Sequence, residues 1–191
     1  MKKHLLTAAL GLALFAGVAQ AAPTADFSRG ITVVQPDAGF LAAADSLGVE
    51  VAPIKGRNLR FPIIAGSLDL ATAGGEILHN NGITLTAGGT EVQLRNFAID
   101  TAAADGPVLT GLVVVNESVV GRIPLFDLTL PAVSLPLEPR FRIGFLAIPG
   151  VQLNLTAAAG DALDEIFGVD AFAGGGLLIG EASVYAFGLR N

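Results

Sequence analysis

Residue types that commonly carry out catalysis are scarce in this sequence. Histidine occurs at His4 and His79 only, and cysteine is absent. One histidine outside the N-terminal segment cannot form a His–His or His–Cys metal site. A histidine-based triad would have to use His79, but no Gly-x-Ser-x-Gly turn precedes a helix, and Ser67 and Ser183 fit ordinary strand positions. We therefore expect no catalytic residue, no metal site and no enzymatic activity.

The acidic residues do not form a recognisable catalytic pair either. Glycoside hydrolysis needs two carboxylates at a defined separation, and the scattered positions do not indicate one. Asp161, Asp164 and Glu165 lie within one expected helix and predict its solvated face. The glycine-rich stretches lack the following Lys-Ser/Thr of a phosphate loop and predict turns. These stretches are residues 74–75, 88–89 and 174–176.

The first 21 residues have the three parts of a secretory signal peptide. Lys2 and Lys3 provide a basic start, an apolar run from Leu5 to Val18 follows, and Ala19-Gln-Ala21 is a cleavage site of small residues. The apolar run is shorter than the roughly 20 residues of a membrane-spanning helix. The sequence therefore predicts a signal peptide over 1–21, one domain over 22–191, and a secreted or periplasmic protein.

Composition limits the partners that this domain can have. Removal of residues 1–21 takes away Lys2 and Lys3, which leaves 9 basic and 17 acidic residues and a net charge of −8. This charge argues against binding to nucleic acid or to anionic membrane surfaces. Aromatic residues make up only 6% of the chain, too few for the girdles of an outer-membrane barrel. We expect a protein that is not integral to a membrane.

The remaining chain has the pattern of a β-rich domain with two short helices. Asp37 can cap a helix that ends near Leu47, and Thr156 can cap a second one that ends near Phe167. Short Val-, Ile-, Leu- and Thr-rich runs between turn residues predict strands elsewhere. We expect an all-β fold, an antiparallel sandwich or flattened barrel, with roughly eight to eleven strands by turn spacing.

Two hairpins stand out locally. Asn81-Gly82 is typical of a two-residue turn whose residues both have positive φ. This register would pair His79 with Thr84 and would place His79 on the polar face, opposite the core. A second turn is predicted at Asn116-Glu-Ser118.

The segment from Pro124 to Pro149 is rich in proline and in apolar residues. Its prolines predict an irregular or edge segment. Within it, Phe141, Ile143 and Phe145 alternate with arginines, which indicates a half-buried strand.

Several motifs occur in an order that resembles one known family. Phe-Pro-Ile from Phe61, Gly-Ser-Leu-Asp-Leu, Ile-Leu-His-Asn-Asn-Gly-Ile-Thr-Leu and Val-Gln-Leu-Arg-Asn-Phe-Ala-Ile-Asp100 follow one another, and Leu-Asn-Leu-Thr-Ala-Ala-Ala-Gly starts at Leu153. This order resembles the HtaA domain, a secreted β-rich module of bacterial haem uptake. The resemblance covers roughly half of the chain.

The resemblance implies candidate residues for haem. His79 matches the position of the family's histidine, whereas the family's N-terminal Trp and haem-ligating Tyr have no counterpart between Ala22 and Asn58. The only tyrosine is Tyr185. Because neutral imidazole and tyrosinate both bind haem iron, the resemblance makes His79 and Tyr185 the candidate ligands and haem the candidate cofactor.

Three functions remain open at this point. The first is an exported, non-enzymatic binding or envelope-associated domain with no assigned cofactor. The second is an HtaA-like carrier of haem or of another apolar ligand. The third is a structural subunit that associates with itself through apolar edge strands.

Overall fold

Ten strands and two helices make up the part of the protein that the structure describes. The computed structural model describes residues 23–138 and 144–190. The elements in this part are β1 (Thr24–Pro36), α1 (Ala38–Ser46), β2 (Glu50–Pro53), β3 (Arg60–Asp69), β4 (Gly75–His79), β5 (Gly82–Ala87), β6 (Thr90–Asp100), β7 (Val108–Val115), β8 (Ser118–Thr129), β9 (Phe145–Leu155), α2 (Ala157–Phe167) and β10 (Leu178–Arg190).

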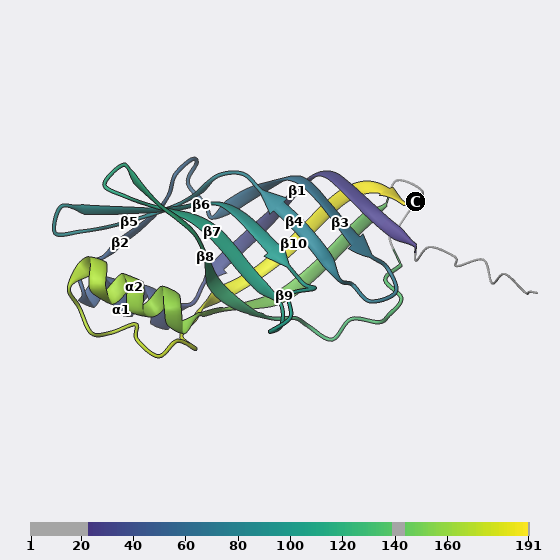
Figure 1. Ribbon diagram of the computed structural model, residues 1–191. Coiled ribbons are helices and arrows are strands. Elements are labelled where there is room, and N and C mark those ends of the chain that lie inside the picture. Colours follow the sequence, from purple (N-terminus) through teal and green to yellow (C-terminus); the bar gives the residue numbers. More distant parts are fainter. Residues whose placement is uncertain (1–22, 139–143, 191) are drawn as a thin grey trace, which may run out of the picture.

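Eight of the strands close into an antiparallel barrel. Their order is β6-β4-β3-β1-β10-β9-β8-β7, and β7 pairs back with β6. Figure 1 shows these strands inclined around a common axis. Side chains alternate between the two faces of the wall: Val184 and Ala186 of β10 are at most 2% exposed, whereas Tyr185 between them is 36% exposed. This alternation is what fills a small barrel with apolar side chains.

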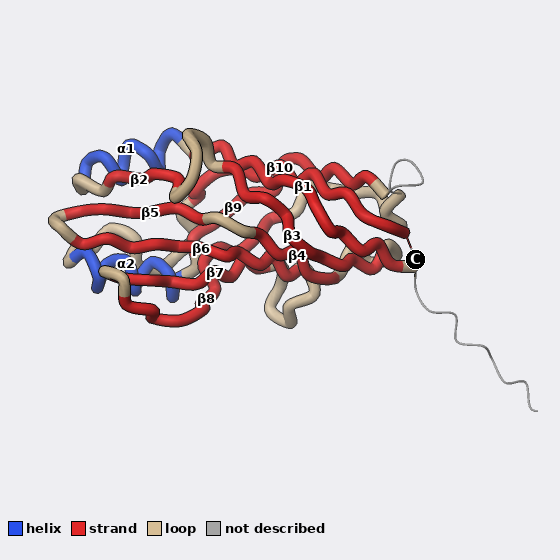
Figure 2. The backbone as a smooth tube through the Cα atoms, turned by 90° about the horizontal axis from the view of Figure 1, so that it is seen from above, coloured by secondary structure: helices blue, strands red, loops and turns tan. Residues whose placement is uncertain are grey.

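The sheet extends beyond the barrel at one end. There β5 pairs with the first half of β6, and β2 pairs with the outer edge of β5. Because β4 pairs with the second half of β6, β4 and β5 follow one another along the same edge of that strand. The two strands are separated by Asn80 and Asn81, which belong to neither. The side-chain amide of Asn81 donates to the carbonyl oxygens of Lys55 and Arg60. The barrel wall ends and the extension begins at these two residues. Figure 2 shows the extension at the end of the molecule where β2 and β5 lie.

Both helices lie at the end of the molecule where the sheet extends (Figure 1). The Asp37 carboxylate caps α1 by accepting from the backbone N–H groups of Gly39 and Phe40. The Thr156 hydroxyl caps α2 by accepting from Ala159, and Gly168 ends α2 with φ of 68°. These are the caps that the sequence predicts. No helix in residues 23–138 and 144–190 is long and apolar enough to cross a membrane.

The predicted all-β class with two helices is confirmed, and the closed wall makes the fold a barrel rather than a sandwich. The turn at Asn116-Glu117 is also confirmed, since both residues have positive φ and Val115 pairs with Ser118. The sequence alone could not separate barrel from sandwich, because closure depends on the pairing of β6 with β7, not on any local pattern.

The hairpin predicted at Asn81-Gly82 is wrong. Asn81 does have positive φ, but β4 and β5 both pair with β6 instead of with each other. The true two-residue turn lies at Gly88-Gly89, where Ala87 pairs with Thr90. His79 therefore does not pair with Thr84.

Other predictions fall partly outside the described residues. The signal peptide over 1–21 lies outside them, as do Phe141 and Ile143 of the predicted half-buried strand. Phe145, the third residue of that pattern, begins β9. Residues 130–138 carry no helix or strand, as their prolines predict, whereas Pro124 and Pro149 lie within β8 and β9.

Candidate functional site

His79 points into the barrel and forms a buried polar pair there. Its side chain is 3% exposed, and its Nε2 lies 2.7 Å from the hydroxyl oxygen of Thr32, which is 4% exposed. The prediction that His79 occupies the polar outer face is wrong. Because β4 continues toward β5 without reversing, Ile77 and His79 share the inner face, and the half-buried Leu78 takes the outer one.

The second ring nitrogen of His79 is a buried polar atom without a well-aligned hydrogen bond. Among the described residues, no group makes a hydrogen bond of good geometry to Nδ1, although the backbones of Phe97 and Ile77 lie close enough to act on the ring. Whichever tautomer the ring adopts, the donor or lone pair of Nδ1 is therefore poorly satisfied. Such a group is costly in an apolar interior, so its presence marks this position as a candidate functional one.

Burial also fixes the charge of the ring. Loss of solvent lowers the pKa of His79 from 6.5 to about 4, although the backbones of Phe97 and Ile77 favour the charged ring to a smaller extent. Among the described residues, no charged side chain lines the cavity beside it. At neutral pH the barrel therefore contains a neutral imidazole.

The space around this pair is a narrow apolar cavity of about 50 Å³. Thr32 and His79 are the polar side chains in its wall. The other lining residues are aliphatic, aromatic or proline, and include Phe61, Phe97 and Val151. The rings of Phe61 and Phe97 meet edge to face at a centroid distance of 5.1 Å.

A second apolar cavity, also of about 50 Å³, lies between the helices and the extension of the sheet. Its walls include Ala44 of α1, Leu163 of α2 and Val92 of β6. Four residues line both cavities, so the two cavities lie next to each other in the apolar interior. These residues are Phe40, Ile83, Phe126 and Ile179.

Tyr185 lies on the opposite side of the wall from His79. It faces outward from β10, and its neighbour on that face is Phe187, which is 38% exposed and packs against Phe145 with the two rings tilted and 4.8 Å apart. Between β10 and β4 stand β1 and β3. The structure therefore does not bring the two candidate haem ligands together.

Asp164 has a role that sequence reasoning missed. It was expected on a solvated helix face, as Asp161 and Glu165 are, but its carboxylate accepts hydrogen bonds from the backbone N–H groups of Ala171, Phe172 and Ala173. Partial desolvation raises the pKa of Asp164, but these three N–H groups outweigh it and hold the pKa below its ordinary value. These residues follow Asp164 by seven to nine positions, a separation for which the sequence holds no capping or turn motif.

The remaining sequence expectations concern absences and ordinary positions. Ser67 is exposed on β3, and Ser183 is half-buried on β10. Within the described ranges, no group of three or more His, Cys, Asp or Glu side chains could hold a metal ion.

The fold and interior define a small β-barrel domain with a helix-covered extension of its sheet. No family model matches this sequence, and no curated protein matches it either. Among solved structures, the chain is similar to the C-terminal domain of HtaA from Corynebacterium glutamicum, with 15% sequence identity and a TM-score of 0.62. The match covers 87% of this chain and 99% of that domain. The resemblance drawn from the sequence is thus confirmed at the level of the fold.

The interior does not fit the haem group that the resemblance implies. Haem is a broad, rigid macrocycle, whereas the interior offers two narrow cavities of about 50 Å³ each. His79 already uses Nε2 for Thr32, and Tyr185 lies outside the barrel. The two candidate axial ligands therefore lie on opposite sides of the barrel wall.

Proposed function

We propose that this protein is an exported, non-enzymatic binding domain whose interior holds an apolar ligand. The observation that carries the proposal is the adjacent pair of apolar cavities, with Thr32 and His79 as the polar side chains of an otherwise apolar wall. Binding sites for small molecules combine such apolar walls with a few placed polar groups. The signal-peptide pattern over 1–21 supports a secreted or periplasmic location.

A binding experiment with a matched pair of variants tests this proposal. The probe is dansyl-labelled undecanoic acid, added to the mature chain of residues 22–191. Its hydrocarbon chain is slender enough for narrow cavities that exclude a broad macrocycle, and the fluorescence of its label rises in an apolar site. Ala44 is 2% exposed and lines the cavity under α1, whereas Ala42 on the same helix is exposed. Ala44→Leu fills the cavity and is expected to weaken probe binding at least tenfold, and Ala42→Leu is expected to leave it unchanged.

The outcome decides between an interior site and a surface site. Saturable binding to one site, lost in Ala44→Leu alone, supports the proposal. Equal binding by both variants would place the probe on the surface and would overturn it. Thermal melts of both variants show whether the larger side chain introduced by Ala44→Leu strains the core, which typically costs about 1–3 kcal/mol.

Haem is a second candidate ligand, favoured by the likeness of the fold to the HtaA domain. The narrow interior and the separation of His79 from Tyr185 weigh against it. A haem titration followed in the visible spectrum tests it, with His79→Ala and Tyr185→Phe as variants. A one-to-one Soret shift that either variant abolishes would replace the apolar-chain proposal with haem binding. Binding that neither variant changes would indicate surface adsorption.

A further inference from the structure

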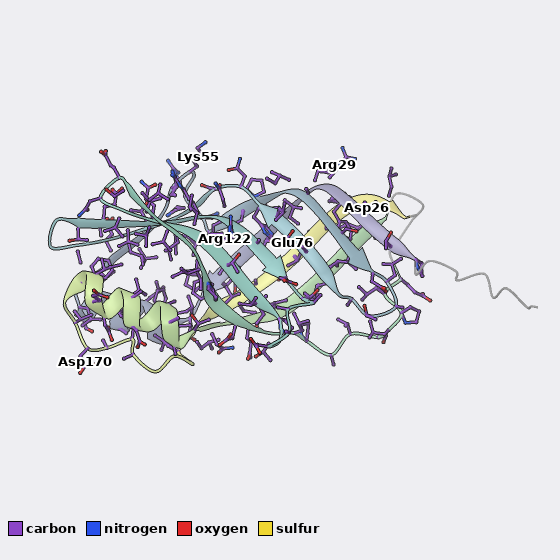
Figure 3. All side chains as sticks on the ribbon, viewed as in Figure 1. Asp26, Arg29, Lys55, Glu76, Arg122 and Asp170 are labelled. Carbon is purple, nitrogen blue, oxygen red and sulfur yellow. The ribbon has the colours of Figure 1, made fainter. Side chains whose placement is uncertain are left out.

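The loop after α2 places one aromatic ring in the interior while the residues beside it remain outside. Phe172 is 5% exposed and lines the cavity between the helices and the sheet. Its neighbours Ala171 and Ala173 are exposed, as is Asp170, which Figure 3 shows pointing away from the barrel. The ring of Phe172 therefore reaches from the surface of the protein into the apolar interior.

One side chain holds this loop against α2. The carboxylate of Asp164 accepts from the backbone N–H groups of Ala171, Phe172 and Ala173 at 2.8 to 3.1 Å. The carbonyl oxygen of Asp164 also accepts from the N–H of Val169, at 3.1 Å. Four backbone groups of residues 169–173 thus depend on a single residue of the helix.

Glycines lie at both ends of the held segment. Gly168 has φ of 68° and Gly174 has φ of 86°, and a Cβ at either position would meet nothing within 4 Å. Beyond Gly174 the chain is fixed again, because the N–H of Gly176 donates to the carbonyl oxygen of Leu155 at 2.7 Å. Since glycine changes its backbone angles at low steric cost, residues 169–173 can move between two fixed ends.

The contact between the segment and α2 is close. A Cβ on Gly160 would collide with the carbonyl oxygen of Phe172. The loop therefore packs on the helix only because residue 160 has no side chain. This gives a second way to displace the loop without changing Asp164.

We propose that residues 169–173 form a gate to the apolar interior, with the ring of Phe172 as its plug and Asp164 as its latch, and that a hydrocarbon chain enters by displacing this ring. The inference rests on the proposed function, since it describes how the interior site is reached. The plug and the chain are both apolar, so exchange of one for the other keeps the cavity wall dry. Loss of the latch raises the population of the open form and therefore the rate of ligand entry.

The test compares two aspartates of the same helix. Asp164→Ala removes the latch, whereas Asp161→Ala changes an exposed residue of α2. Stopped-flow mixing with dansyl-labelled undecanoic acid is expected to show association roughly tenfold faster in Asp164→Ala than in the wild-type protein, and an unchanged rate in Asp161→Ala. Hydrogen exchange of residues 169–173 is expected to quicken in Asp164→Ala alone.

Gly160→Ala is the second opening variant. The added methyl group favours the helix but prevents the loop from docking, so we expect the same faster association without loss of helical signal. Equal association rates in the wild-type, Asp164→Ala and Gly160→Ala proteins would overturn the gate and leave the binding function in place. No probe binding by any variant would overturn both, even with faster exchange of the loop in Asp164→Ala.

Discussion

His79 and Thr32 meet inside the barrel, 47 residues apart in the chain, with the imidazole Nε2 2.7 Å from the hydroxyl oxygen. Their strands, β4 and β1, are not neighbours, because β3 lies between them. The contact therefore bridges the inner face of the wall across one intervening strand. It is the polar feature of the cavity that we propose as a ligand site.

Acid is expected to destabilise the protein through His79. Its pKa is about 4 in the folded chain and about 6.5 in the unfolded chain, so between these values the unfolded state binds more protons. The stabilising contribution of the neutral ring is complete above pH 6.5, is lost as the pH falls toward 4, and amounts to about 3 kcal/mol. Urea unfolding at a series of pH values measures how the free energy of unfolding falls with pH. His79→Phe should remove this pH dependence between pH 6.5 and 4. A dependence that persists in the variant would contradict its attribution to His79.

Removal of the Thr32 hydroxyl should also destabilise the fold. Thr32→Val keeps the shape of the side chain but leaves Nε2 of His79 unpaired in the barrel, at a cost of about 1–3 kcal/mol. Thr84→Val, on the outer face of β5, is the control and should change stability by less than about 0.5 kcal/mol. Thermal denaturation followed by circular dichroism compares the two. Equal effects would mean that the pair contributes little.

The junction of the barrel with the extension depends on Gly82. A Cβ at this position would lie against the carbonyl oxygen of Leu94 and 2.7 Å from the Cβ of Arg95. We expect Gly82→Ala to cost about 1–3 kcal/mol and to loosen the pairing of β5 with β6, seen as faster amide exchange there. Gly89→Ala meets no nearby atom, but Gly89 has φ of 85°, so it reports backbone strain without the collision. If Gly82→Ala leaves the free energy of unfolding and the amide exchange unchanged, β5 can move away from β6 at little cost and the prediction is wrong.

Self-association is tested at the start of β8. Val119 and Val120 are each 63% exposed, and β9 pairs with β8 only from Phe126 onward. Exposed apolar edges of this kind promote pairing with other chains. We expect concentration-dependent association in light scattering, reduced in Val120→Lys with little change in melting temperature. A wild-type protein that stays monomeric at high concentration would contradict this expectation.

Export predicts a defined N-terminus for the mature protein. Cleavage after Ala21 leaves Ala22 as the first residue. Intact-mass measurement of protein recovered from outside the cytoplasm checks this. A species that retains residues 1–21 would argue against a cleaved signal peptide.

The sequence by itself determined the features that depend on local chemistry. The caps at Asp37 and Thr156, the turn at Asn116-Glu117 and the β-rich class follow from side chains acting on nearby backbone, and all of them are present. The resemblance to the HtaA domain rested on such short motifs and holds for the fold.

Only the tertiary structure decided which residues share the interior. Asn81 has the positive φ that a hairpin would need, yet the chain does not turn back on itself there, because β4 and β5 each pair with β6 instead of with each other. A strand's side chains alternate with a period of two, so this one difference turned His79 from the polar face to the core. The contact of His79 with Thr32 joins two strands 47 residues apart, and that of Asp164 with Phe172 joins α2 to the loop after it. No local sequence pattern relates either pair, so only the folded chain shows them.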